Sequence, residues 1–192
     1  MTIEFERFEQ TRQEESRDSG LVSFFQRIAE QQPDRTRIVF VCIGTDRSTG
    51  DAFGPLVGTL LRERGWPRVI GTLAEPCDAH TVAHAQATVG ERDTVIAIDA
   101  CLGHPKSIGS FIAANRALQP GKAIGRQLPP VGHYSIAGVV NSHGPKAYWK
   151  LQTTSLNFVM QMAGKVAAAA EQAWMQPGAS SDEELIKLPI PL

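Results

Sequence analysis

Two apolar runs, each followed by an acidic residue, constrain the fold of this chain more than any other feature. Residues 37–44 contain Ile-Val-Phe-Val-Cys-Ile, and residues 93–103 contain Val-Ile-Ala-Ile. Asp51 lies in the Gly-rich segment after the first run, and Asp99 directly follows the four apolar residues of the second. Runs of this kind are typical of strands buried on both faces of a parallel sheet. Functional groups of such sheets lie at the carboxyl ends of the strands, so we expect both acids at one sheet edge.

The rest of the chain alternates between helix and strand patterns. A helix capped by Asp51 is expected to carry apolar residues at helical spacing and to end at Gly65, before Pro67. Further strands are predicted over residues 69–74, 94–98, 110–115 and 134–140, and further helices over residues 19–30, 79–91 and 153–176.

This element order predicts an α/β fold with a mostly parallel sheet covered on both faces. Short β–α–β connections favour right-handed crossovers, and the common doubly wound order places the first and third strands side by side. The chain then reverses direction between those strands and opens a crevice at their carboxyl ends. Asp51 and Asp99 are therefore expected to meet at this crevice.

The composition is that of one compact domain. The chain has 192 residues, 42% hydrophobic content and a net charge of −1, which argues against nucleic acid as a partner. We expect residues 1–36 to form a helical extension, residues 37–176 the α/β core and residues 177–192 a tail. No window resembles a membrane span or a signal peptide, so a cytoplasmic protein is expected.

Each acid also has a structural interpretation. Asp51 could act only as a helix cap. Asp99 ends an apolar strand, where burial of a carboxylate is costly without a partner, so a functional role is favoured for it. Asp46 is typical of an ordinary turn. Arg47 is a candidate for orienting an acid or a substrate carbonyl, or else a solvated loop charge.

The cysteines show no Cys-x-x-Cys spacing that would indicate zinc or a redox pair. Cys42 and Cys101 are predicted to fill the core as small apolar residues, and Cys77 to be an exposed loop thiol. Among the histidines, His80 and His84 could share one helix face, either as a surface pair or as half of a zinc site.

Three segments resemble the YyaC-type sporulation proteins, which are relatives of the spore germination protease. They are Gly-Thr-Asp-Arg-Ser-Thr-Gly-Asp-Ala-Phe-Gly-Pro at residues 44–55, Ile-Asp-Ala-Cys-Leu-Gly at residues 98–103, and Leu-Pro-Pro-Val-Gly-His-Tyr-Ser-Ile-Ala-Gly-Val-Val-Asn at residues 128–141. The resemblance spans residues 37–165. It implies a three-layer α/β/α, phosphorylase/hydrolase-like fold similar to that of the hydrogenase maturation endopeptidases.

The resemblance also implies site residues. Asp51 and Asp99 match the two acids of the germination protease, and Asn141 ends a segment that partly matches its Gly-Ser-Gly-Val-Gly-Asn-like motif. In the hydrogenase maturation enzymes, equivalent acids and a later histidine bind a metal such as nickel. By this resemblance Asp51, Asp99 and His133 could hold nickel or zinc. Asp46, Arg47, His133 and Asn141 are assigned substrate-binding or supporting roles.

These observations predict a sporulation-associated peptidase that uses the Asp51 and Asp99 carboxyls. Two close carboxyls can share a proton and activate a water molecule, or they can bind a divalent metal that does so. The alternatives are a non-catalytic homologue that binds a peptide or protein in sporulation, and a metal-binding maturation endopeptidase. The expected substrates are proteins or peptides, with small acid-soluble spore proteins as one candidate, in the cytoplasm of the spore or sporulating cell. Homo-oligomer formation stays open.

Overall fold

The computed structural model describes residues 20–78, 81–121 and 128–175, which build a twisted sheet with helices on both faces. The strands are β1 (Ile38–Cys42), β2 (Val69–Ile70), β3 (Thr94–Gly103), β4 (Phe111–Ala114) and β5 (Tyr134–Ser142), in the spatial order β2-β1-β3-β5-β4. The strands β2, β1, β3 and β5 are parallel to their neighbours, and β4 runs antiparallel to β5. The mostly parallel sheet and the adjacency of the first and third strands are as predicted.

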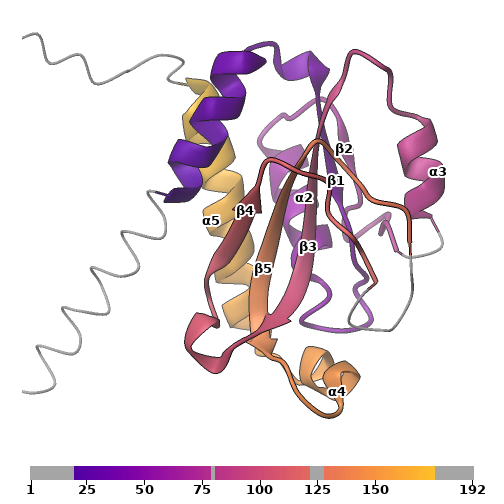
Figure 1. Ribbon diagram of the computed structural model, residues 1–192, viewed down its shortest axis with the longest axis vertical. Helices are drawn as coiled ribbons and strands as arrows, with labels where there is room; N and C mark the ends of the chain where they lie inside the picture. Colours follow the sequence, from indigo (N-terminus) through magenta and orange to yellow (C-terminus); the bar gives the residue numbers. More distant parts are fainter. Residues whose placement is uncertain (1–19, 79–80, 122–127, 176–192) are drawn as a thin grey trace, which may run out of the picture.

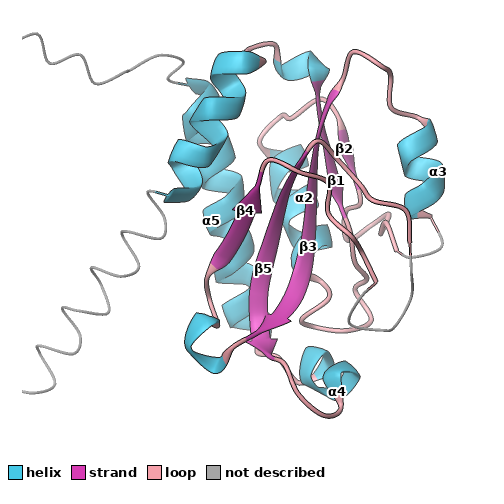
Figure 2. Cartoon of the chain, viewed as in Figure 1, coloured by secondary structure: helices cyan, strands magenta, loops and turns pink. Residues whose placement is uncertain are grey.

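Helices cover the sheet from two sides, which confirms the three-layer architecture. The helix over residues 20–31, α2 (Phe53–Glu63) and α5 (Leu156–Met175) pack in one core cluster, and α3 (Val82–Ala87) packs in the other (Figures 1 and 2). Two 3₁₀ turns, η1 (Arg35–Arg37) and η2 (Pro105–Ser107), and the short helix α4 (Ala147–Gln152) complete the order. No helix among the described residues combines the length and apolarity needed to cross a membrane.

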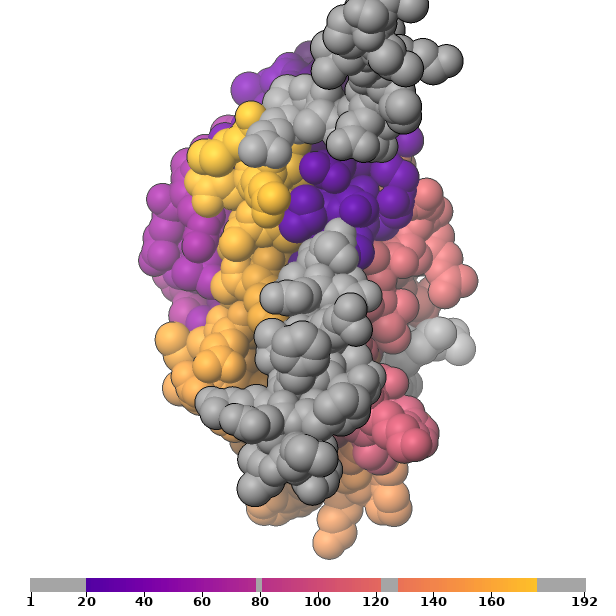
Figure 3. Space-filling model, turned by 90° about the vertical axis from the view of Figure 1, so that its left-hand side faces the viewer, coloured from indigo at the N-terminus to yellow at the C-terminus, as the bar shows by residue number. Residues whose placement is uncertain are grey.

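The N-terminal helix packs against α5, as Figure 3 shows for residues 20–31 beside the long C-terminal helix. The Phe25 ring meets the Trp174 ring edge-on, with centroids 6.2 Å apart, and the Phe40 ring of β1 at 6.3 Å. Edge-to-face aromatic pairs at such distances are favourable beyond the area they bury. The helix is therefore part of the main core. Residues 1–19 and 176–192 lie outside the described residues.

The alternation of side chains along β3 decides which way Asp99 points. Ile96 and Ile98 belong to the core cluster on the α2 and α5 face, whereas Val95 and Ala97 belong to the cluster on the α3 face. Successive strand residues point to opposite faces, so Asp99 continues the row of Val95 and Ala97. The carboxyl of Asp99 thus lies on the more thinly covered α3 face.

The second strand is shorter than the predicted range 69–74 because Gly71 interrupts it. Gly71 has φ of +87°, and a Cβ there would collide with the Cys42 carbonyl oxygen. The Thr72 N–H then donates to the Glu75 carbonyl at 3.0 Å, which turns the chain. Beyond the turn, Cys77 forms a parallel bridge with Ile43. Cys77 is 2% exposed, so the prediction of an exposed thiol was wrong.

The predicted helix over residues 153–176 corresponds to α5, and a break at residues 153–155 separates α5 from α4, which precedes it in the chain. The Thr154 hydroxyl donates to the Lys150 carbonyl at 2.7 Å and closes the end of α4. The Ser155 carbonyl accepts the Val159 N–H at 3.1 Å and opens α5. Side-chain hydrogen bonds of this kind compete with a continuous helix. The helix α4, which the sequence analysis did not predict, lies where β3 and β5 end (Figure 1).

Two further elements differ in length from their predictions. The helix α3 has six residues, whereas a helix over residues 79–91 was predicted, and residues 79–80 lie outside the described residues. The strand β3 continues beyond the predicted end at residue 98 to Gly103, because β5 pairs with it as far as Gly103 and Ser142.

Candidate active site

A cleft of about 970 Å³ opens at the carboxyl ends of β1 and β3. Its walls come from the β1–α2 loop, the ends of β3 and β5, the β4–β5 connection and α4. The lining combines apolar side chains with three carboxyls, one arginine and one histidine: Ile43, Leu102, Leu118, Leu128, Leu151, Asp51, Asp78, Asp99, Arg47 and His143 are among them. Such a cleft at a topological switch point is where ligands bind in open α/β sheets.

The β1–α2 loop holds Asp51 at the cleft through close backbone packing. Gly44 has φ of +143°, and a Cβ there would collide with the Asp51 carbonyl oxygen. A Cβ at Gly54 would collide with the Ile43 carbonyl oxygen. Only glycine allows the backbone to approach this closely at both positions. The loop is therefore folded back on the end of β1, which brings Asp51 over the sheet edge.

The prediction that Asp51 caps α2 was wrong. The cap residue is Ala52, which has helical backbone angles, and no side chain hydrogen-bonds to the first turn there. The Ala52 N–H instead donates to the Ser48 carbonyl at 2.9 Å. The same turn also takes up the N–H of the first helical residue, because the Phe53 N–H donates to the Gly50 carbonyl at 3.3 Å. This leaves the Asp51 carboxyl available to the cleft.

The second acid, Asp99, sits on β3 beside β5. It pairs in register with Ala137, whose small side chain also lines the cleft. One carboxyl oxygen, Oδ1, accepts the Ala100 N–H at 2.8 Å. The structure therefore brings Asp51 and Asp99, which are far apart in sequence, into one cleft, as the sequence analysis expected.

The electrostatics of the two acids differ from those of surface carboxyls. Burial raises the pKa of Asp51 to about 6, the Thr45 backbone N–H opposes this effect, and the charge of Asp78 adds to it. Burial raises the pKa of Asp99 well above its usual range, and the negative charge of Asp51 raises it further, against the Ala100 hydrogen bond. Two close carboxyls do not ionise independently. The shifts thus favour a pair in which Asp51 ionises first and its charge helps Asp99 to keep its proton.

A third acid, Asp78, was not singled out from the sequence. Its Oδ1 accepts the Thr81 N–H and hydroxyl, each at 3.3 Å, at the start of α3. Asp78 follows Cys77, which the bridge to Ile43 holds at the end of β1. The signal for this residue was its place after the second strand, at the same carboxyl edge as the other acids. Asp78 therefore supplies negative charge to the cleft from a third chain segment.

The structure places Cys101 differently from the prediction of a core-filling residue. It is half-buried and lines the cleft, on the same face of β3 as Asp99. Burial raises the pKa of the Cys101 thiol to about 11, and the charge of Asp99 contributes. A thiol with this pKa is neutral at pH 7, so it lines the cleft as an uncharged side chain.

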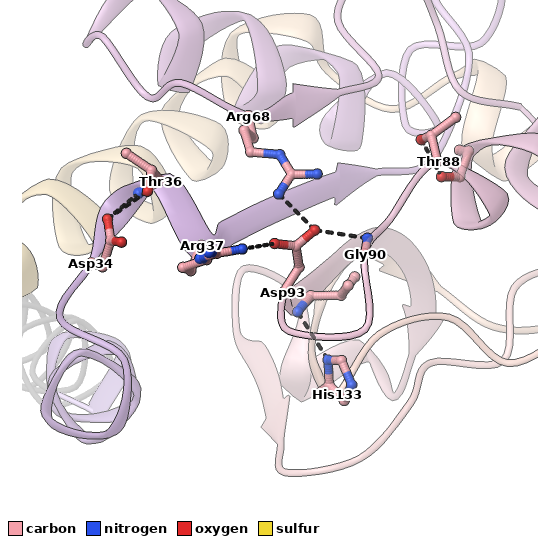
Figure 4. A network of polar contacts seen from close by, with 10 residues as sticks. Asp34, Thr36, Arg37, Arg68, Thr88, Gly90, Asp93 and His133 are labelled. Carbon is pink, nitrogen blue, oxygen red and sulfur yellow. Dashed lines mark hydrogen bonds and ion pairs between the residues drawn. The ribbon is translucent and has the colours of Figure 1, made fainter.

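His133 lies at the other end of the sheet, which contradicts its predicted role beside the two acids. Its Nδ1 accepts the Val95 N–H at 3.0 Å, and its own backbone N–H donates to the Val95 carbonyl at 2.9 Å. Figure 4 shows this ring near Asp93, whose carboxyl receives Arg68 at 2.6 Å and Arg37 at 3.8 Å. His133 precedes β5, which is parallel to β3, so it belongs to the amino-terminal edge. It is a structural residue there.

The remaining predicted residues divide between the cleft and its support. Arg47 lines the cleft. Asp46 is exposed and is not among the lining residues. Asn141 lies behind the cleft, where its Nδ2 donates to the Lys150 carbonyl at 3.0 Å and to Thr154 Oγ1 at 3.2 Å. Asn141 therefore holds α4, whose Leu151 lines the cleft.

Among the histidines, His143 contributes to the cleft lining, whereas His104 does not. His104 Nδ1 accepts the Lys106 N–H at 3.2 Å and caps η2. His84 lies in the last turn of α3, and His80 lies outside the described residues. The expected His80 and His84 pair is thus described only in part.

The donor groups do not fit the metal site that the resemblance implied. Within residues 20–78, 81–121 and 128–175, no three His, Cys, Asp or Glu side chains are gathered closely enough to hold a metal ion. The histidine that was expected to complete the site is bonded to Val95 at the opposite edge. Two acids without that histidine do not reproduce the three-ligand set.

Comparisons with known proteins identify the family. A family model described as "Protein of unknown function (DUF1256)" matches residues 10–169. The chain belongs to the DUF1256 family. The "Uncharacterized protein YyaC" of Bacillus subtilis (strain 168) is 46% identical to this chain over 135 residues, which is 68% of this chain and 66% of YyaC. The aligned part thus covers slightly less than two thirds of that relative, and the resemblance to YyaC-type proteins is confirmed.

Two solved structures match this DUF1256 protein over most of its length. The NiFe hydrogenase maturation protease HycI from Thermococcus kodakarensis KOD1 has a TM-score of 0.49 and 24% identity, over 73% of this chain and 94% of that one. The NiFe hydrogenase maturation protease HybD from Thermococcus kodakarensis has a TM-score of 0.46 and 14% identity, over 71% of this chain and 97% of that one.

Proposed function

We propose that this protein is a peptidase that hydrolyses a peptide bond of a protein substrate with Asp51 as general base and Asp99 as general acid. One observation carries the proposal: the two carboxyls line the same cleft, and the charge of Asp51 adds to the burial that keeps Asp99 protonated. Paired titratable groups whose environments separate their pKa values are the usual arrangement for acid and base roles. The assignment of base and acid follows from two shifts: burial raises the pKa of Asp51 to about 6, and burial together with the Asp51 charge raises the pKa of Asp99 well above its usual range.

The reaction needs one water molecule and the two carboxyls. The Asp51 carboxylate removes a proton from water while the water oxygen bonds to the carbonyl carbon of the scissile peptide. Asp99 then gives its proton to the peptide nitrogen, and the C–N bond breaks to release an amine and a carboxylic acid. Afterwards Asp51 carries a proton and Asp99 is ionised, so proton exchange with solvent restores the starting state. General acid and base transfers of this kind contribute roughly 10²–10⁴-fold each.

The proposal contains no metal step, because the described donors do not gather three ligands in the cleft. Carboxylates alone are sufficient chemistry for peptide hydrolysis when one of the pair holds a proton. A chelator is therefore expected to leave the activity unchanged.

The substrate class follows from the cleft and from the YyaC-type resemblance. A volume of about 970 Å³ with four leucines among the lining residues suits several residues of a polypeptide in extended form. We place the activity in a sporulating bacterium, in the cytoplasm of the cell or spore, with small acid-soluble spore proteins as substrates. The resemblance to relatives of the spore germination protease supports this part of the proposal.

The test is cleavage of purified small acid-soluble spore proteins by the wild-type chain and by Asp51→Asn and Asp99→Asn, with products read by mass spectrometry. Asp46→Asn is the matched control, since Asp46 is an exposed acid of the same loop outside the cleft lining. We expect cleavage by the wild type and the control, and a loss of at least about 10²-fold in both site variants.

Three other outcomes would redirect the assignment. Full cleavage by both site variants would disprove the acid pair. Cleavage that a chelator abolishes would indicate a metal-dependent peptidase. Saturable binding of the spore proteins without any products would indicate the non-catalytic binding homologue.

A further inference from the structure

Ser48 is the feature of the cleft that the proposed chemistry leaves unused. Its side chain is 7% exposed, it lines the cleft, and its Oγ is buried without a hydrogen-bond partner. Only two other buried side-chain atoms of the described residues share that condition, Arg35 Nη2 and Trp66 Nε1, and neither residue lines the cleft. The Arg35 guanidinium stacks over the Trp66 ring at 4.1 Å, which gives it a favourable contact of another kind. Ser48 therefore has the one unpaired buried group at the candidate site.

The backbone places Ser48 and Asp51 on one turn. The Ser48 carbonyl accepts the Ala52 N–H at 2.9 Å, which closes a helix-like turn around Asp51. In such a turn, side chains three positions apart lie on the same side, with Cβ atoms about 5–6 Å apart. The Gly50 N–H donates to the Leu151 carbonyl at 2.8 Å and fixes the turn against α4. The Ser48 and Asp51 side chains thus project from the same side of this turn.

An unpaired buried hydroxyl is unfavourable, and alanine would fill this position without that cost. Serine at this position is accounted for if the hydroxyl finds its hydrogen-bond partner only in the state of the protein that carries out the reaction. The Asp51 carboxylate lies three positions further along this turn, and a hydroxyl that donates to a carboxylate makes a strong, charge-assisted hydrogen bond.

We propose that Ser48 is a positioning residue for Asp51, whose hydroxyl turns to donate to the ionised Asp51 carboxylate and holds it in the orientation that accepts a proton from water. The inference rests on the proposed function of Asp51 as base. It assigns no substrate contact to Ser48, because its Oγ is shielded from the cleft solvent.

The test compares wild type with Ser48→Ala and Ser48→Thr in the full chain. The first readout does not need turnover: the side-chain carboxyl ¹³C resonance of Asp51 is followed from pH 4 to 9, with Asp51→Asn used to assign it. Loss of a donor to the charged form should raise the Asp51 midpoint by about one pH unit in Ser48→Ala. Ser48→Thr keeps the hydroxyl and should keep the wild-type midpoint. The other charged or titratable groups that line the cleft, which are Arg47, Asp78, Asp99, Cys101, His143 and Tyr148, are the same in all three proteins.

The second readout is peptide cleavage. In Ser48→Ala we expect kcat to fall about tenfold with KM unchanged, because the base is misoriented while the cleft lining is preserved. Thermal unfolding should show no loss of stability in Ser48→Ala, and Ser48→Thr should recover kcat.

Distinct results separate the two proposals. A wild type without cleavage would refute the peptidase function, and the Asp51 titration would still decide the role of Ser48. An unchanged Asp51 midpoint in Ser48→Ala would overturn the positioning role. Lower stability in Ser48→Ala with wild-type kcat would also overturn it and show that Ser48 only supports the fold.

Discussion

Asp99 of β3 pairs in register with Ala137 of β5, and both residues line the cleft. Register partners on neighbouring strands project from the same face of the sheet, so the Ala137 side chain lies beside the Asp99 carboxyl. A methyl group at this position leaves room for a substrate next to the Asp99 carboxyl. A larger residue at this position would occupy the space where the scissile peptide must lie.

Ala137→Leu should therefore impair substrate binding. The larger side chain points into the open cleft, so it should raise KM or abolish cleavage, with a free energy of unfolding within about 1 kcal/mol of wild type. Ala113→Leu is the matched control, because Ala113 is an exposed residue of the neighbouring strand β4. Steady-state kinetics and urea unfolding of both variants test this. Equal KM values in the two variants would show that Ala137 does not face the substrate.

The proton states of the two acids predict a bell-shaped dependence of kcat/KM on pH. Below about pH 6 Asp51 is protonated and the base is lost, and at high pH Asp99 loses the proton that it must donate.

The raised pKa of Asp51 also makes the free energy of unfolding depend on pH. A carboxyl whose folded pKa is raised binds its proton more tightly in the folded state, so its stabilising contribution is lost as pH rises through the folded pKa. The free energy of unfolding of wild type minus that of Asp51→Asn should decrease from pH 4 to pH 7. A flat difference would contradict the raised Asp51 pKa.

Asp78 provides a way to shift the acid limb of that profile. Its negative charge contributes to the raised pKa of Asp51, so Asp78→Asn should move the acid limb to lower pH. The acid limb is expected to move by less than the full raised shift, since burial contributes more than the Asp78 charge to the raised pKa of Asp51. The pH profile of Asp46→Asn should stay at the wild-type position. An acid limb that does not move in Asp78→Asn would remove Asp78 from the electrostatics of the base.

The residues of the site differ in how far the sequence could predict them. Asp51 and Asp99 follow two strong apolar runs, and the parallel order of those strands is enough to place both acids at one edge. Asp78 depends on the bridge between Cys77 and Ile43, which forms after Gly71 has broken the second strand and leaves no periodic pattern. Leu151 reaches the cleft through α4, which has only six residues and is too short to show a helical periodicity in the sequence.

The error at His133 has a different cause. A residue that precedes a parallel strand lies at the edge opposite to one that follows such a strand. His133 precedes β5, whereas Asp99 lies toward the carboxyl end of β3, and the two strands are parallel. The predicted parallel order of the strands thus already placed His133 and Asp99 at opposite edges of the sheet. The assignment of His133 to the site relied instead on the motif resemblance, which gives no information about position in the fold.

Asn141 connects the sheet to the wall of the cleft, so its removal should affect both stability and activity. Asn141→Ala deletes donors to the Lys150 carbonyl and the Thr154 hydroxyl and the acceptor for the Ser142 N–H. Half-buried polar groups that lose their partners cost about 1–3 kcal/mol, which should appear in urea unfolding. The release of α4 should also lower kcat/KM, because Leu151 and Tyr148 line the cleft from that helix. Thr153→Ala removes one exposed hydrogen bond to the Trp149 carbonyl of the same helix and should leave both quantities near wild type.

His133 should behave in the opposite way, as a residue of the fold alone. Its ring accepts the Val95 N–H beside the Asp93 ion pairs, so His133→Ala leaves a backbone donor of the β3 start without its partner. We expect a decrease of about 1–3 kcal/mol in the free energy of unfolding. At temperatures where the variant is folded, kcat and KM should equal the wild-type values, because the ring is at the amino-terminal edge of the sheet and the acids are at the carboxyl edge. A kcat reduced as far as in Asp99→Asn, with unchanged stability, would instead place His133 in the chemistry. The relevant measurements are urea unfolding and cleavage kinetics of the three proteins under one set of conditions.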